Sequence, residues 1–118
     1  MSEKDACTGD SDRFLFDESE REILTSAIEE FGIDPQVDMA IEECAEVIQA
    51  IQHHKRGRES GDRVVEEIAD AIIILNQLAL MFDRHKVGSH IAEKLDQLNH
   101  RVETGEWNAR LNTDTDQS

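Results

Sequence analysis

The sequence predicts an all-α fold, and three observations point to it. The chain of 118 residues holds one Pro, six Gly and four Phe but no Tyr, a composition that favours helices over a β-sandwich. Four segments carry apolar residues at helical spacing, and no segment shows the alternation of a β-strand. Glycines separate these segments along the chain. We therefore expect a single domain built as a four-helix bundle.

Polar, acidic tails flank the helical segments. Residues 1–16 are rich in Asp and Ser, although the apolar residues 14–16 at their end are expected to dock on the helices. Residues 108–118 form a second polar tail, for which we expect disorder. The helical domain should therefore span residues 17–107.

The first predicted helix runs from about Glu18 to Phe31 and ends at Gly32. Ser19 and Glu22 have the spacing of a capping box, in which two side chains satisfy free backbone N–H groups at the helix start.

The second predicted helix starts at Asp34-Pro35, because Asp is a favourable N-cap and proline suits the first helical position. It ends near Gly57 in a basic last turn, which suits the negative end of the helix dipole. Its expected inward-facing residues are Val37, Ala40, Ile41, Cys44, Val47, Ile48 and Ile51.

The third predicted helix is the longest, covering about residues 63–86. Within residues 71–82 only Asn76 and Gln77 are polar, and this pair either lines a pocket or forms satisfied buried amides. A helix that is apolar all round must be enclosed by other helices. Three thin partners cannot cover it, so we expect at least a homodimer.

The fourth predicted helix follows Gly88-Ser89 and ends at Gly105. Trp107 comes directly after it and is expected at a subunit interface.

The charge of the chain excludes two classes of partner. It carries 12 Lys and Arg against 27 Asp and Glu, a formal net charge of −15. Nucleic acids and anionic membranes are polyanions, so neither is an expected partner.

The apolar runs are too short to span a bilayer, the N-terminus does not resemble a signal peptide, and the two Cys cannot form a disulfide scaffold. We expect a cytoplasmic protein, and the acid excess also suits a salt-rich cytoplasm.

Two pairs of acids share helix faces. Glu43 and Glu46 are three residues apart on the second predicted helix, as are Glu67 and Asp70 on the third. A short loop joins these helices, so they should be antiparallel neighbours. The stripe that holds Glu67 and Asp70 turns apolar one turn later, which predicts that both acids lie at the mouth of an enclosed region.

A divalent cation is the simplest compensation for such acids, because burying unpaired carboxylates is costly. An all-oxygen donor set suits Mg²⁺ or Mn²⁺. Zinc is disfavoured because the cluster lacks Cys and His, and a di-iron site because no Glu-x-x-His motif is present. The alternative is a solvated acidic face.

The spacing Glu42-Glu43-x-x-Glu46, followed by Glu67-x-x-Asp70, resembles the EExxE…ExxD signature of the MazG-like, all-α nucleoside triphosphate pyrophosphohydrolases. This resemblance implies a helical bundle that forms a homodimer or homotetramer and depends on Mg²⁺. It also implies cleavage of a (d)NTP between the α- and β-phosphates, which releases a monophosphate and pyrophosphate.

The resemblance covers about residues 28–82, and it assigns the metal ligands. They would be Glu43, Glu46, Glu67 and Asp70, whereas the role of Glu42 stays open. Either Glu43 or Glu46 would also take the proton of the attacking water as general base.

Three further side chains are candidates for substrate binding. Lys55 and Arg63 could stabilise charge on the leaving pyrophosphate, or they could be a helix-end charge and a surface residue. Gln77 lies on the same helix face as Asp70, where the family often has a polar residue.

Two other functions remain open. The chain could be a catalytically silent helical oligomer that acts as a nucleotide sensor or a protein-interaction module. It could also be a structural acidic bundle whose carboxylates are spread over solvent.

Overall fold

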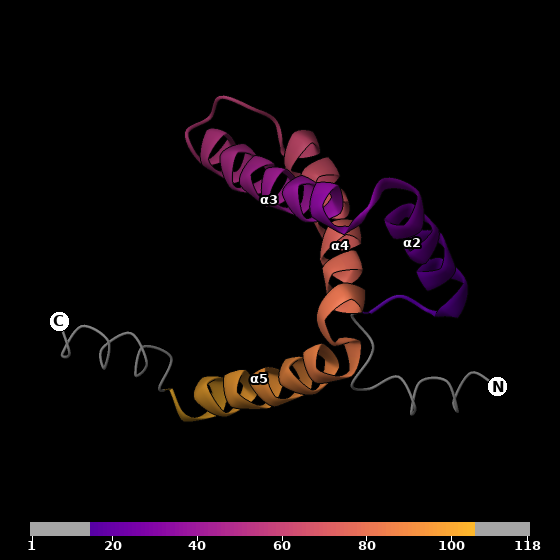
Figure 1. Cartoon of the computed structure of the whole chain (residues 1–118). Helices are drawn as coiled ribbons and strands as arrows, with labels where there is room; N and C mark the ends of the chain where they lie inside the picture. Colours follow the sequence, from indigo (N-terminus) through magenta and orange to yellow (C-terminus); the bar gives the residue numbers. More distant parts are fainter. Residues whose placement is uncertain (1–14, 106–118) are drawn as a thin grey trace, which may run out of the picture. The chain divides into compact units, whose positions relative to one another are not determined.

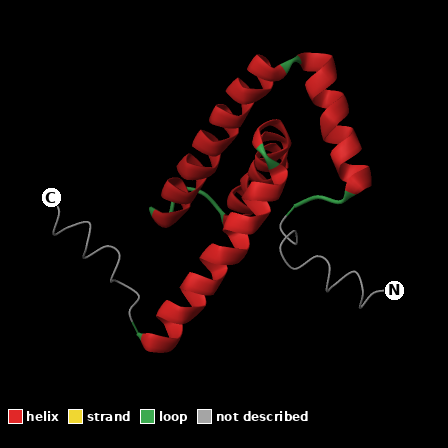
Figure 2. Ribbon diagram, turned by 60° about the horizontal axis from the view of Figure 1, so that its bottom comes forward, coloured by secondary structure: helices red, strands yellow, loops and turns green. Residues whose placement is uncertain are grey.

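The computed structural model describes residues 15–105, and all regular structure in this range is helical. The helices are α2 (Glu18–Phe31), α3 (Ile33–Lys55), α4 (Gly61–Phe82) and α5 (Arg84–Thr104) (Figure 1). Figure 2 shows the same ribbon with helices and connecting loops but no strand in the described part. The all-α prediction is confirmed. The predicted tails, apart from residues 15 and 16, and Trp107 lie outside the described residues.

The chain divides into two compact units. One unit spans Leu15–Arg84 and contains α2, α3 and α4, whereas the described part of the other unit is essentially α5. Within the first unit, residues 56–60 join α3 and α4 into a helical hairpin, and α2 contacts both helices (Figure 1). The predicted adjacency of the two acid-bearing helices is therefore confirmed. No helix in the described part of the chain has the length and apolar character needed to cross a membrane.

The start of α2 is capped by Asp17 rather than by Ser19. Asp17 Oδ1 accepts a hydrogen bond from the Glu20 backbone N–H, and Glu20 Oε1 accepts one from the Asp17 N–H, both at 2.9 Å. The predicted capping box at Ser19 and Glu22 is wrong, because Ser19 instead donates its hydroxyl to Asp17 Oδ1 at 2.9 Å. Asp and Ser are equally good N-caps, so the sequence is compatible with a helix capped by Asp17 or by Ser19.

A single glycine joins α2 to α3. Gly32 has φ +94°, in the left-handed region that side chains disfavour, and it is the N-cap of α3. The predicted N-cap Asp34 is wrong, since Asp34 lies inside the first turn of α3. Its carboxylate is still favourable there, because it faces the positive end of the helix dipole.

The boundary between α4 and α5 also differs from the prediction. α4 ends at Phe82, Asp83 is extended, and α5 begins at Arg84, so the predicted continuation to residue 86 is wrong. The predicted helix start after Gly88 is wrong as well, because Gly88 lies buried inside α5. A glycine within a helix costs only about 1 kcal/mol relative to Ala, which does not by itself end a helix.

The core of the first unit is small and consists mainly of alanines. Its buried apolar residues are Leu15, Leu24, Ala40, Ala50, Ala71, Ile74 and Ala79. The prediction that α3 turns Ile41, Ile48 and Ile51 inward is wrong for the single chain, because they are 65%, 56% and 49% exposed. The small side chains let the helices approach closely, whereas many of the large apolar side chains remain exposed.

Two amides tie α4 to the segments that precede it. Asn76 Oδ1 accepts a hydrogen bond from the Phe16 N–H at 2.8 Å, and its Nδ2 donates to the Ile72 carbonyl at 3.0 Å. Gln77 Nε2 donates to the Leu24 carbonyl of α2 at 3.3 Å. Asn76 is therefore a satisfied buried amide, and the predicted docking of residues 15 and 16 is confirmed.

Replacing Asp17 by Ala should lower the melting temperature by a few degrees, whereas Ser19→Ala should change it less and Asp17→Asn should retain the cap. The capping hydrogen bonds lower the pKa of Asp17 below 3.8. Its stabilising contribution is thus present at neutral pH and is lost as the pH falls through that lowered value. Thermal melts followed by circular dichroism at neutral and at strongly acidic pH measure these changes. A larger effect of Ser19→Ala than of Asp17→Ala would show that Ser19 is the N-cap.

Replacing Asn76 by Ala should lower the free energy of unfolding by about 1–3 kcal/mol, because the Phe16 N–H loses its acceptor in a largely buried place. Urea unfolding measures the change. Gln49→Ala, at an exposed position of α3, is the matched control and should stay within about 0.5 kcal/mol. Equal stability of both variants would contradict this role of Asn76.

Candidate metal centre

Three carboxylates converge where α3 and α4 face each other. One oxygen from each of Glu43, Glu46 and Glu67 lies within 4.8 Å of the other two. Glu43 and Glu46 are one turn apart on α3 and therefore share a face, and the hairpin brings Glu67 of α4 against that face. The structure thus brings together three of the four acids that the sequence predicts as metal ligands.

Asp70, the fourth predicted ligand, lies outside this cluster of three and is exposed. It follows Glu67 by almost one turn of α4, and its charge still acts on Glu43. Glu42 is exposed on α3 and acts on Glu43 most weakly among the neighbouring acids. A ligand role for Asp70 remains a prediction.

The three acids differ in their contact with solvent. Glu67 is 8% exposed, and its Oε1 is buried without a hydrogen-bond partner among residues 15–105. Glu43 is half-buried, and its Oε1 likewise lacks a partner in that range, whereas Glu46 is exposed. Buried carboxylate oxygens without donors are unfavourable. The cluster therefore has the donors and the free coordination capacity for a hard cation.

The cluster raises the pKa of Glu43. Burial is the largest cause, and the repulsive charges of the neighbouring acids add to it. Those acids are, in decreasing order of effect, Glu46, Asp70, Glu67 and Glu42. Glu43 therefore holds its proton to a higher pH than a free glutamate does, and its charged form is the one that the neighbouring acids disfavour.

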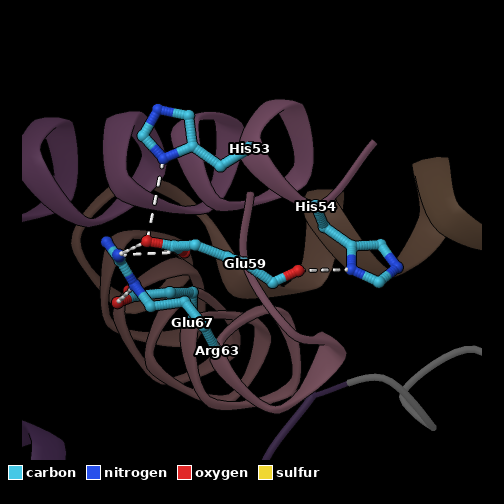
Figure 3. A network of polar contacts seen from close by, with 5 residues as sticks. All are labelled: His53, His54, Glu59, Arg63 and Glu67. Atoms are coloured by element: carbon cyan, nitrogen blue, oxygen red, sulfur yellow. Dashed lines mark hydrogen bonds and ion pairs between the residues drawn. The ribbon is translucent and has the colours of Figure 1, made fainter. Parts of the chain in front are cut away.

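The Arg63 side chain lies between Glu67, a member of the cluster, and Glu59 of the loop that connects α3 to α4 (Figure 3). Its Nε donates to Glu67 Oε2 at 3.3 Å, and its Nη1 donates to the two carboxylate oxygens of Glu59 at 2.9 and 3.2 Å. The bond to Glu67 and the charge of Glu59 raise the pKa of Arg63, which keeps its positive charge. This one charge is shared between two carboxylates, so it cannot neutralise the cluster.

The remaining predicted residues are not part of the cluster. Lys55 is the exposed last residue of α3, and Gln77 uses its Nε2 on the Leu24 carbonyl. Their substrate contacts remain predictions. Sequence reasoning missed Glu59, although its position four residues before Arg63 is the spacing at which opposite charges pair on a helix.

A second feature of the hairpin is an apolar groove of about 530 Å³. It is lined by Val37, Ala40, Ile41, Cys44, Ala45, Ile48, Leu78 and Phe82. Cys44 is a free, half-buried thiol in this wall.

Comparisons with protein families, with characterised proteins and with solved structures find no match to this chain.

Replacing Glu43 by Gln should raise the melting temperature of the metal-free protein at neutral pH by a few degrees, because it removes a half-buried charge that its neighbours repel. A raised carboxyl pKa destabilises the fold at high pH. The penalty is absent below the ordinary pKa of 4.5 and grows as the pH rises through the raised value.

Calorimetry in the presence of a chelator measures this effect. Glu30→Gln, at an exposed position of α2, makes the same charge change and should leave the melting temperature nearly unchanged. A lower melting temperature for Glu43→Gln than for the wild type at neutral pH would show that the carboxylate stabilises the fold.

Proposed function

We propose that this chain is a MazG-like nucleoside triphosphate pyrophosphohydrolase that depends on Mg²⁺ or Mn²⁺. It would cleave a (d)NTP between the α- and β-phosphates and release a nucleoside monophosphate and pyrophosphate. The observation that supports this most is the convergence of Glu43, Glu46 and Glu67 from two helices, at the positions of the acidic motif. The buried oxygens of Glu43 and Glu67 that lack partners among residues 15–105 add to it.

The residues of the cluster fit a hard divalent ion. All donors are carboxylate oxygens, which Mg²⁺ and Mn²⁺ prefer, and a small number of carboxylates leaves room for substrate phosphates. Glu43, Glu46 and Glu67 would hold the ion, with Asp70 as the proposed fourth ligand. When bound, such an ion polarises the phosphate and lowers the pKa of coordinated water.

The residues of the chain would then position the reactants and accept a proton. A water oxygen forms a bond to the α-phosphorus while the bond from that phosphorus to the bridging oxygen breaks. Pyrophosphate leaves with the electrons of the broken bond, and the proton of the water passes to Glu43 or Glu46 as general base.

Lys55, Arg63 and Gln77 are the proposed substrate-binding residues. Lys55 ends α3 near the loop and is exposed, so its ammonium is free to approach the leaving pyrophosphate. Arg63 already lies next to the cluster through Glu67.

We further propose that the chain forms a homodimer or homotetramer. Many large apolar side chains are exposed in the single chain, which is typical of an interaction surface. Among the exposed ones are Ile41, Ile48, Ile51, Val65, Ile68, Ile73 and Phe82 of α3 and α4. A second copy would cover part of this surface.

The same exposed surface also suits the second candidate, a catalytically silent module that senses nucleotides or binds a protein partner. Turnover separates the two functions, because this candidate could retain the cation site without hydrolysis.

The wild-type chain should release pyrophosphate from at least one member of a (d)NTP panel when Mg²⁺ or Mn²⁺ is present, and a chelator should abolish this. Glu43→Gln and Glu67→Gln should each lower kcat on the order of 100-fold or more. Glu30→Gln is the matched control, since it makes the same charge change on α2.

Far-ultraviolet circular dichroism checks that each variant remains helical. Wild-type turnover that survives in both Glu43→Gln and Glu67→Gln would remove the proposed site. Cation binding without turnover of any nucleotide would favour the sensor.

A further inference from the structure

The side chain of Arg63 is held from both sides. Its Nε donates to Glu67 Oε2, and its Nη1 donates to both carboxylate oxygens of Glu59 (Figure 3). Each partner is four residues away, so the three side chains lie in a row along the first turns of α4 and the end of the preceding loop. A guanidinium can make these contacts simultaneously because its N–H groups form a rigid planar fork.

The two oxygens of Glu67 have different surroundings. Oε2 accepts the Arg63 hydrogen bond, whereas Oε1 is buried and has no hydrogen-bond partner among residues 15–105. The Glu67 side chain is only 11% exposed. Arg63 thus fixes the carboxylate through one oxygen, whereas the other oxygen accepts no hydrogen bond from residues 15–105. One of the two Glu67 oxygens lies within 4.8 Å of oxygens of Glu43 and Glu46.

We infer that Arg63 is a positioning residue of the cation site, which orients the Glu67 carboxylate through Oε2 so that Oε1 is presented to the ion, and that Glu59 holds Arg63 in this orientation. This inference rests on the cation site of the proposed function. It gives Arg63 a role that needs no nucleotide. A residue that hydrogen-bonds to a metal ligand, and thereby orients it, raises the affinity for the cation although it does not contact the ion.

Glu59 also compensates the positive charge of Arg63. A lone guanidinium beside a cation site would repel the ion, but the Glu59 carboxylate at 2.9 Å balances the charge of Arg63. Glu59 is itself attached to the end of α3, because its backbone carbonyl lies 3.0 Å from His54 Nδ1 and its carboxylate 3.7 Å from His53 Nδ1. A chain of contacts therefore connects Glu67 on α4, through Arg63 and Glu59, to the end of α3.

Whether the removal of Arg63 weakens or strengthens cation binding distinguishes an orienting role from a purely electrostatic one. If Arg63 acted only through its charge, its removal would strengthen cation binding, because a nearby positive charge opposes the ion. If Arg63 orients Glu67, its removal should weaken binding despite the lost positive charge. A role in phosphate contact alone would leave the affinity of the nucleotide-free protein for the ion unweakened.

The experiment measures Mn²⁺ binding to the full chain without nucleotide, by electron paramagnetic resonance of free Mn²⁺. Arg63→Gln should weaken Mn²⁺ affinity about tenfold or more. Arg63→Lys should also weaken it, because an ammonium cannot reproduce the planar fork. Arg58→Gln is the matched control, since it removes the same charge at an exposed position of the neighbouring loop and should not weaken binding.

A double-mutant cycle tests the role of Glu59. Glu59→Gln should weaken Mn²⁺ binding in the wild-type background and have little further effect in the Arg63→Gln background, because Glu59 acts through Arg63. Helical circular dichroism of every variant shows that the fold is retained, and Arg63→Lys serves if Arg63→Gln does not fold.

The possible failures are distinguishable. If the wild type binds no Mn²⁺, the cation site of the proposed function and the role of Arg63 both fall. If the wild type binds Mn²⁺ and Arg63→Gln binds it equally or more tightly, only the positioning role is overturned. Additive effects of Glu59→Gln and Arg63→Gln would overturn the part assigned to Glu59.

Discussion

The repulsion among carboxylates between α3 and α4 is the constraint on which the rest of the structure depends. The helices approach closely because the residues they bury are small, among them Ala40, Ala50 and Ala71. The same approach brings oxygens of Glu43, Glu46 and Glu67 within 4.8 Å of one another. A fold optimised for stability alone would avoid this arrangement, because apolar groups of similar size are commonly more stable there. Carboxylates that are held together against their mutual repulsion are typical of a functional site.

Each buried polar residue of α4 has a separate structural task. Asn76 accepts the Phe16 N–H and fixes the chain just before α2, and Gln77 attaches α4 to the Leu24 carbonyl in the middle of α2. Glu67, ten residues before Gln77, faces α3 and the other acids. Asn76 and Gln77 therefore attach the segment before α2 and α2 itself to defined points of α4.

Sequence patterns were sufficient for the presence of the four helices and for the meeting of three of the four acids, but they failed where two physical solutions compete. Helical periodicity located α2, and the three-residue spacing of Glu43 and Glu46 placed both acids on one face of α3. The cap of α2 was ambiguous because Asp17 and Ser19 are both good N-caps. The inward orientation of Ile41 was wrong because periodicity identifies an apolar face without saying whether it meets the same chain or another molecule.

The acid cluster and the apolar groove lie on different faces of α3. At about 100° per residue, Glu43 and Glu46 are roughly 140–200° from Ile41 around the helix axis, whereas Ile48 is within about 20° of it. The acids face the first half of α4, but the groove opens where Leu78 and Phe82 of its last turns border α3. A second copy that covers the groove can therefore assemble without displacing the ligands of a cation. The proposed assembly and the proposed cation binding would use different sides of α3, so any rigidity that a second copy gave to α3 would also hold Glu43 and Glu46 in place.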